Sequence, residues 1–484
     1  MLKKFYIALV GLWFVCIGAV GQTTFTYQGI KYGINSKGEA YVAENPNVSG
    51  NITIPGTVYN GDKSYDVREI GDWAFDGNQN LKSITISGLV RKIGNSAFFE
   101  CKALTTVKMG DYMQEIGGSA FAYCSALTDI KLPGSINTIG TYAFSDCVSL
   151  ESIKIPLYLN DIQEFTFDGC RSLKTVNTKE AAFLKSIGKY AFNGCSSLFD
   201  LTLPTTVTRI GDSAFESCSS LDRFEIPESV ESIGKSAFLN CTALSSIVIP
   251  SKISVVDENT FSGCTSLTSA TLPETMYAIG YKAFFGCRLS SIDMPKSMDY
   301  LQPMAFMNCS SLSSVTIPSG IEEISNNAFS GCTSLTTVTL PESVTTIGQG
   351  AFQNCKLTAI EFPKSLTKIG SNAFSFCDWL ETVTCTSYTP PVMEHVSAFS
   401  NAAYDNATLI VPDKAYYDYL QSYGWDMFEN TKSAAIEDVF AETTTVADIF
   451  NLQGIIIKRN ASKEDLHSLP AGIYIVNGKK IVVK

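Results

Sequence analysis

The feature that most limits what this chain can fold into is a phenylalanine that returns at a nearly constant interval. The interval is about 23 residues, within the range of about 20–50 residues that is typical of repeat proteins. Only three steps deviate: Phe167 to Phe192 is longer, and Phe284 to Phe306 and Phe352 to Phe374 are shorter. The sequence therefore predicts about 14 repeats, whose phenylalanines stand at positions 75, 98, 121, 144, 167, 192, 215, 238, 261, 284, 306, 329, 352 and 374.

Each repeat carries the same pattern around its phenylalanine. Cysteine follows three residues later in thirteen of the fourteen repeats, with Asn78 as the exception, and leucine follows five or six residues later in all of them. Ile, Val or Leu stands five residues before the phenylalanine in every repeat. Between repeats, apolar and polar residues alternate up to a proline, as in Ile247-Val248-Ile249-Pro250. This alternation predicts a short β-strand, which ends at the proline because proline cannot donate to a sheet ladder.

The segments between the strands predict turns. Glycine stands four residues before the phenylalanine in ten repeats, and we expect it to adopt a positive φ. In the other four repeats we expect slight strain, because Gln163, Asp257, Gln302 and Ser325 take this place. The Ala-Phe-x-x-Cys segment is too short for a regular helix, so one helical or 3₁₀ turn is expected.

A unit this short cannot bury its own apolar side, so neighbouring units must stack and bury like residues against like. The predicted fold is mostly β with short helical turns: a solenoid of about 14 repeats, capped at both ends, with a small β tail. The repeat core is represented by three columns of Phe, Cys and Leu, which include Phe98, Cys101, Leu104, Phe121, Cys124, Leu127, Phe238, Cys241 and Leu244.

The two ends depart from the repeat. Lys3 and Lys4, an apolar stretch and Ala19-Val20-Gly21 predict a signal peptide over residues 1–21, with an uncleaved membrane anchor as the alternative. No other apolar run approaches the length of a membrane span, so we expect no transmembrane segment in the mature chain. Around repeats at 71–385, the sequence predicts an N-terminal cap at 22–70, a C-terminal cap at 386–430, a linker at 431–445 and a β tail at 446–484, in which Asn477-Gly478 predicts a hairpin turn.

The tryptophans suggest how the stack ends. Trp73, Trp379 and Trp425 stand in the first repeat, the last repeat and the predicted C-terminal cap. Large side chains at these places are interpreted as seals over the open ends of the stack.

Cysteines are unusually regular for a chain that is predicted to be secreted. Thirteen of the fifteen occupy one repeat position that points inward. Neighbours would lie about 5 Å apart, so distance alone permits a disulfide. The odd number and the parallel side chains nevertheless favour buried free thiols.

Several classes of function are disfavoured. The net charge of −11 argues against nucleic acid, whose phosphates need a surplus of Lys and Arg. The two histidines, His395 and His467, lie outside the repeats, so no nucleophilic triad and no zinc site can be assembled there. A carboxylate pair such as Glu322 and Glu323 is interpreted as solvated surface. The sequence therefore predicts no enzyme, no metal and no cofactor.

One run of outward positions stands out. Lys108, Lys131 and Lys154 occupy the same strand position in three successive repeats. Like charges on adjacent strands destabilise a sheet. The lysines either splay and pair with Asp129 or with turn acids, or they form a stripe that binds an anionic glycan or an acidic protein. The candidate ligand-binding residues are Lys108, Lys131, Lys154, Asp129 and Asn177.

The combined phase of Phe, Cys, Leu, Ile-Pro and Ile-Gly resembles the leucine-rich repeats of BspA-type surface proteins of Bacteroidetes. The resemblance covers about residues 25–430 and implies a curved, right-handed solenoid with a parallel sheet on one face. The tail, with Leu469-Pro470-Ala471-Gly472, resembles a type IX secretion sorting domain. The alternative is a small β cap without a sorting role.

The resemblance implies a secreted, extracellular or cell-surface protein that does not catalyse a reaction. We expect it to bind a host matrix protein, a glycan or another bacterium through its sheet face. Two alternatives are a structural or assembly scaffold of the envelope without a host ligand, and a glycan-binding accessory protein. The scarcity of exposed aromatic residues at strand positions weighs against strong stacking on sugars.

Overall fold

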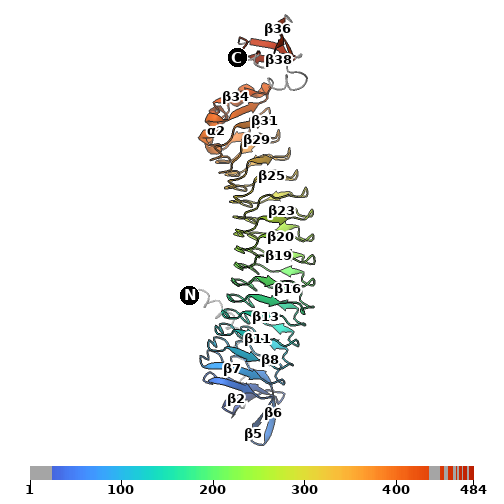
Figure 1. Ribbon diagram of the computed structural model, residues 1–484, viewed down its shortest axis with the longest axis vertical. Helices are drawn as coiled ribbons and strands as arrows, with labels where there is room; N and C mark the ends of the chain where they lie inside the picture. Colours follow the sequence, from blue (N-terminus) through green and yellow to red (C-terminus); the bar gives the residue numbers. More distant parts are fainter. Residues whose placement is uncertain are drawn as a thin grey trace. The chain divides into compact units, whose positions relative to one another are not determined.

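The computed structural model describes residues 24–434, 447–451, 456–461, 465, 468–470, 472–476 and 479–483. The predicted signal peptide at 1–21, residues 435–445 of the predicted linker, His467 and Asn477-Gly478 lie outside this part of the chain. The chain forms two compact units, Met1–Leu221 and Asp222–Lys484. Within each unit, the strands of successive coils lie side by side (Figure 1).

The first unit begins with strands that do not follow the repeat. β1 (Thr24–Tyr27), β2 (Ile30–Ile34) and β3 (Ala40–Val42) pair antiparallel, and β5 (Thr57–Asn60) forms an antiparallel pair with β6 (Lys63–Ile70). β3 and β6 pair parallel. Between them, β4 (Gly50–Ile54) pairs parallel with the first repeat strand, β7, and so forms a coil of its own inside the predicted N-terminal cap.

Each coil of the first unit then supplies up to two short parallel strands. The first set carries the strands that the sequence predicts from alternating apolar and polar residues: β7 (Leu81–Ile86), β9 (Thr106–Lys108), β11 (Asp129–Ile130), β13 (Ser152–Lys154), β15 (Thr175–Asn177) and β17 (Asp200–Leu201). Of these, β11, β13 and β17 lead to a proline. The second set precedes the turn at each phenylalanine: β8 (Lys92–Ile93), β10 (Glu115–Ile116), β12 (Thr138–Ile139), β14 (Asp161–Ile162), β16 (Ser186–Ile187) and β18 (Arg209–Ile210).

The second unit repeats this arrangement. Its first set consists of β20 (Ser246–Val248), β22 (Ser269–Thr271), β25 (Ser314–Thr316), β27 (Thr337–Thr339), β29 (Ala359–Phe362), β31 (Thr382–Cys385), β33 (Thr408–Val411) and β34 (Asn430–Ser433). Its second set consists of β19 (Ser232–Ile233), β21 (Val255–Val256), β23 (Ala278–Ile279), β24 (Tyr300–Leu301), β26 (Glu323–Ile324), β28 (Thr346–Ile347), β30 (Lys368–Ile369) and β32 (Val392–Met393).

The repeats number more than the sequence pattern predicts: the solenoid has about 17 turns, not about 14. β4 adds a coil before the first repeat, and β33 and β34 add coils after the last. Phe399 stacks on Phe374 with ring centroids 5.0 Å apart and continues the phenylalanine column into the predicted C-terminal cap. β34 also includes residues 431–433 of the predicted linker. These coils were missed because they lack the cysteine and the regular spacing.

Few helices interrupt the strands. Between β32 and β34 lie η2 (Val396–Ala398), α2 (Asn401–Asn406), η3 (Asp413–Ala415), α3 (Tyr416–Gln421) and η4 (Trp425–Met427). The indole of Trp425 is fully buried among Phe399, Tyr419 and Phe428, and its Nε1 donates to the Pro391 carbonyl oxygen at 2.8 Å. Trp425 therefore lies in the interior of the C-terminal part of the solenoid.

The tail is a separate small sheet. β35 (Ala447–Asn451), β36 (Ile456–Ala461), β37 (Gly472–Val476) and β38 (Lys479–Val483) pair antiparallel in the order β36-β35-β37-β38. β37 and β38, which flank the predicted hairpin turn, face each other with Val476 opposite Lys479.

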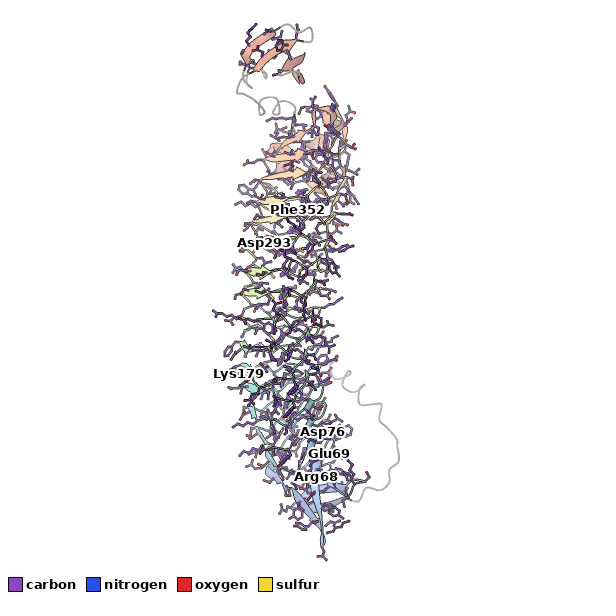
Figure 2. The ribbon with its side chains drawn as sticks, turned by 90° about the vertical axis from the view of Figure 1, so that its right-hand side faces the viewer. Arg68, Glu69, Asp76, Lys179, Asp293 and Phe352 are labelled. Carbon is purple, nitrogen blue, oxygen red and sulfur yellow. The ribbon has the colours of Figure 1, made fainter. Side chains whose placement is uncertain are left out.

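The inner columns fill each coil. Within each unit, successive phenylalanine rings stack nearly parallel with centroids 5.0–5.5 Å apart. Phe98, Cys101, Leu104, Phe121, Cys124, Leu127, Phe238, Cys241 and Leu244 are all fully buried. In the second unit, Figure 2 shows Phe352 within the stack and Asp293 toward its edge, where its side chain is exposed.

The segment around each phenylalanine is a chain of tight turns with the hydrogen bonds of the predicted 3₁₀ turn, but no helix forms. In the first repeat, the amides of Ala74, Asp76 and Asn78 donate to carbonyl oxygens three residues earlier. A helix cannot propagate, however, because the residues two before and two after the phenylalanine adopt left-handed φ, as Ser96 (φ 51°) and Glu100 (φ 55°) do in the next repeat. Other amides of this segment donate hydrogen bonds to the following coil. The Phe98 amide, for example, donates to the Ala120 carbonyl oxygen at 2.8 Å.

A positive φ was predicted for the glycine four residues before the phenylalanine, and this prediction is wrong. Gly94 and Gly117 do not have positive φ. A Cβ on Gly117 would lie 2.6 Å from the carbonyl carbon of Gly94, in the preceding coil. Glycine is favoured at Gly117 because the backbones of adjacent coils approach closely there.

Candidate binding surfaces

The lysine stripe is a surface of the first unit. Lys108, Lys131 and Lys154 are all exposed, as are Asp129 and Asn177. Asp129 lies opposite Thr106 in the parallel β9–β11 pair, and Asn177 lies directly beside Lys154 in the β13–β15 pair. The β11 and β13 coils adjoin, since the Glu151 amide donates to the Thr128 carbonyl at 3.4 Å. The structure thus brings the five candidate residues together on neighbouring coils.

The three lysines differ in their partners. Lys154 Nζ lies 2.8 Å from Glu180 Oε2, and both side chains are about half exposed or more. Such exposed ion pairs contribute little to stability, because water screens them. Among the residues that the structure describes, neither Lys108 nor Lys131 forms an ion pair with a carboxylate. The sequence suggested that the lysines pair with Asp129 or with acids in the turns. Lys154 pairs with a turn acid, Glu180, and among these described residues none of the three lysines forms an ion pair with Asp129.

Exposed aromatic rings flank these lysines. Tyr112 follows Lys108 by four residues and Tyr158 follows Lys154 by four, at the turn that leaves each strand. Tyr112 is 66% exposed, and Tyr158 and Phe183 are about half exposed and stack with centroids 5.8 Å apart. Phe183 lies within the single longer repeat, between Phe167 and Phe192, so the insertion adds an aromatic ring to this surface. We call Lys108, Lys131, Lys154, Tyr112, Tyr158 and Phe183 the basic–aromatic face.

A second pair of exposed aromatic rings lies in the second unit, in the turn segments. Phe376 and Trp379 are 63% and 62% exposed. The interpretation of Trp379 as an end seal is therefore wrong, and so is that of Trp73, which is 51% exposed. Neither tryptophan, nor Phe376, was identified from the sequence as an outward surface residue, because only strand positions were searched for outward side chains.

The cysteine side chains of the repeats are buried, so their thiols are not placed to react. The fourteen cysteines from Cys101 to Cys385 are buried and form no disulfide. Thiols of the repeats donate to backbone oxygens of the preceding coil, as from Cys124 Sγ to the Phe98 carbonyl at 3.1 Å. Burial raises the pKa of the Cys101 thiol from 9.0 to about 12, and burial likewise raises the pKa of Cys124. A reactive cysteine needs a lowered pKa and exposure, so these thiols are packing groups.

Neither a metal-ligand cluster nor a membrane-spanning helix is found in the part of the chain that the structure describes. Among the described residues, no group of three or more His, Cys, Asp and Glu side chains could hold a metal ion. His395 is exposed and accepts a hydrogen bond from the Ser397 amide at 3.1 Å, as the N-cap of η2. Within the same residues, no helix is both long and apolar enough to span a bilayer.

A solenoid of stacked strand-and-turn coils with a phenylalanine, cysteine and leucine core defines a leucine-rich-repeat protein. The sequence matches the family described as BspA type leucine rich repeat region (6 copies) over residues 68–196, 185–313 and 300–432. The chain therefore belongs to the BspA-type leucine-rich-repeat family.

Solved structures that are similar to this chain include two leucine-rich proteins from bacteria. A leucine-rich-repeat protein from Bacteroides ovatus is 25% identical with a TM-score of 0.52, and the match covers 84% of this chain and 98% of that one. A leucine rich cell surface protein from Faecalibacterium prausnitzii is 26% identical with a TM-score of 0.47, over 76% of this chain and 96% of that one. No curated protein matches the sequence.

Proposed function

We propose that this chain is a non-catalytic, extracellular or cell-surface binding protein that attaches to an acidic protein through its basic–aromatic face. The observation that carries the proposal is the grouping of three exposed lysines with three exposed aromatic rings on neighbouring coils. Membership of the BspA-type leucine-rich-repeat family supports a binding role, because a stacked solenoid presents an extended surface rather than a closed pocket.

The composition of the face favours a macromolecular ligand. Tyrosine and other aromatic residues are enriched where proteins bind each other, because a large rigid ring loses little entropy on burial. Lysines at the rim steer an oppositely charged partner toward the surface. In a chain with a net charge of −11, two lysines without ion-pair partners among the described residues form a local reversal of charge.

The test compares two triple variants of the full chain. Lys108→Glu, Lys131→Glu and Lys154→Glu together should weaken binding to an acidic matrix protein by about tenfold or more, because attraction becomes repulsion. Lys235→Glu, Lys252→Glu and Lys296→Glu change the net charge equally but lie in the second unit, so they should leave binding nearly unchanged. Surface plasmon resonance against a panel of matrix proteins and sulfated or sialylated glycans, at low and physiological salt, measures both.

Three other outcomes decide against parts of the proposal. Equal losses in the two triple variants would show that only total charge matters. Binding to the anionic glycans alone would identify a glycan ligand. No binding across the panel would favour an envelope scaffold without a host ligand.

We also propose that the chain is exported and that its tail is a type IX sorting domain. The compact antiparallel sheet of β35 to β38 supports a folded signal that is separate from the solenoid. Deletion of residues 446–484 should leave the protein in the periplasm of a bacterium that uses this pathway, whereas the full chain reaches the surface. Surface labelling of intact cells distinguishes the two, and surface delivery without the tail would contradict the sorting role.

A further inference from the structure

Phe376 and Trp379 are two large rings that the fold does not use. Phe376 is mostly exposed although Phe374, two residues earlier, is fully buried in the phenylalanine column. Phe376 also adopts a left-handed φ of 59°, at a position that Gly or Asn fills in the other repeats of this unit. Among the described residues, no other aromatic ring contacts Phe376 or Trp379. The coil imposes this φ on the residue two after each repeat phenylalanine, so the backbone does not account for the choice of a large ring here. Because the ring is left mostly in water, packing does not account for it either.

Both rings line one hollow of about 590 Å³, which is built from four successive coils of the second unit. Ligand sites in proteins commonly enclose about 300–1,000 Å³. Adjacent coils are tied together under the hollow by backbone hydrogen bonds, such as that from the Asn354 amide to the Ser375 carbonyl at 2.8 Å. The lining consists of Asn308, Ser330, Gly331, Gln353, Asn354, Phe376, Asp378 and Trp379.

The polar side chains of the hollow have unused hydrogen-bonding groups. The amides of Asn308, Gln353 and Asn354 and the carboxylate of Asp378 make no hydrogen bond to another residue in the described part of the chain. Each amide offers two donors and one acceptor, and the carboxylate offers acceptors. The Asn308 amide lies over Gly331, where a Cβ would come within 2.2 Å of Asn308 Oδ1. A glycine at this place therefore leaves room for the amide inside the hollow.

A nearby lysine holds the indole from one side. Lys356 Nζ lies 5.3 Å from the centroid of the Trp379 ring, within the range of a cation–π contact. The ammonium group covers only one face of the indole. The contact thus helps to orient the ring and leaves its other face for a ligand.

We propose that this hollow is a binding site for an uncharged oligosaccharide. A pyranose ring has an apolar C–H face and a rim of hydroxyl groups. The C–H face can stack on the ring of Trp379 or Phe376. The hydroxyl groups can bond to the donors and acceptors of Asn308, Asn354 and Asp378. The proposal concerns a second ligand at residues remote in sequence from the basic–aromatic face, and it does not depend on the function proposed for that face.

Other ligand classes fit less well. A nucleotide or a sulfated glycan would need cationic groups in the lining, which instead contains one carboxylate and no Lys or Arg. A protein partner would be expected to bury a dry apolar centre, whereas polar side chains surround the two rings here. The expected scarcity of exposed aromatic residues concerned strand positions, whereas Phe376 and Trp379 lie on turn segments.

The experiment titrates the purified full chain with cellopentaose, xylopentaose, mannopentaose and chitopentaose by isothermal calorimetry. At least one of them should give saturable heat. Trp379→Ala should weaken that binding by about tenfold or more, since the stacking platform is lost. Asn308→Ala with Asn354→Ala should weaken it by a smaller factor. Tryptophan emission should shift in the wild-type chain as the sugar covers the indole.

Trp73→Ala is the matched control, because Trp73 is also an exposed tryptophan but lies in the first unit, outside the hollow. It should bind the sugar as the wild type does, and so should the triple Lys→Glu variant of the basic–aromatic face. The proposal is overturned if none of the four sugars gives saturable heat, or if Trp379→Ala binds as tightly as Trp73→Ala. Unchanged amide hydrogen exchange in each variant establishes that the fold is intact.

Discussion

Phe374 and Phe376 are both phenylalanines and lie only two positions apart. Phe374 is fully buried, whereas Phe376 is 63% exposed. Phe374 lies between Phe352 and Phe399 in the inner column, at centroid distances of 5.4 and 5.0 Å. Phe376 lies outside the coil on the turn segment. The comparison teaches that each coil has an interior, where stacking fixes the residue type, and an exterior, where the same backbone carries whatever side chain the surface needs.

The exterior is used differently in the two units. In the first unit, exposed rings on the turns follow exposed lysines on the strands, as Tyr112 follows Lys108 by four residues. In the second unit, the exposed ring of Trp379 lines a hollow with the amide of Asn354, and Lys356 contacts the same ring. The interior is the same in both, so a difference in ligand would come from the exterior columns alone.

The largest expected effect comes from breaking the interior. Phe352→Ala should lower the free energy of local unfolding by about 3–5 kcal/mol, because a fully buried ring is replaced by a cavity. Phe376→Ala should change it by no more than about 0.5 kcal/mol, because the ring is mostly in water. Amide hydrogen exchange resolved by coil measures both values.

The spread of the damage sharpens the comparison. In a solenoid each coil contacts mainly its neighbours, so Phe352→Ala should also increase exchange in the coils of Phe329 and Phe374. Equal effects of the two substitutions would contradict the distinction between interior and exterior.

A smaller effect, absent at neutral pH, concerns the buried thiols. Burial raises the pKa of Cys101, Cys264 and Cys377 to about 12 from an ordinary value of 9.0. Unfolded thiols ionise above pH 9 while folded ones stay protonated, so the unfolded state loses protons first. The stabilisation is complete below pH 9 and is lost between pH 9 and 12, by up to about 1.4 kcal/mol per pH unit for each thiol that is exposed.

Denaturant melts at pH 7, 9 and 10 measure this loss, with Cys101→Ala as a variant that should depend less steeply on pH. Ellman titration in denaturant without reductant should find nearly all thiols of the exported chain free. Six or fewer free thiols would mean that disulfides form, and the alkaline loss of stability would then be smaller.

The repeat period allowed the core to be anticipated residue by residue, because a constant interval places like residues at the same angle around each coil. The predicted phenylalanines, cysteines and leucines are all buried. The period also explains the miscount of turns. Coils such as those of β4 and β33 stack by backbone pairing without the Phe-x-x-Cys pattern, and the pattern was the only signal counted.

The turn segments were predicted less well. Glycine next to Ile suggested positive φ at Gly94 and Gly117, whereas the left-handed residues are Ser96, Glu100 and their equivalents. A single sequence does not distinguish a glycine that serves a left-handed φ from one that serves a close backbone approach, since both favour a residue without a Cβ. Phe376 could have been recognised as a surface residue because small or polar residues fill its position in the other repeats of the second unit. Trp379 was noticed but interpreted as an end seal.

The sequence by itself determined the period, the inward columns and the absence of histidine from the repeats, because these depend only on residue type and spacing. The tertiary structure decided which outward side chains become neighbours. Asn308 and Trp379 are separated by several repeats along the chain, yet they line one hollow because the coils that carry them stack on one another. Such neighbours depend on the rise and the turn geometry of each coil, which the interval between phenylalanines does not specify.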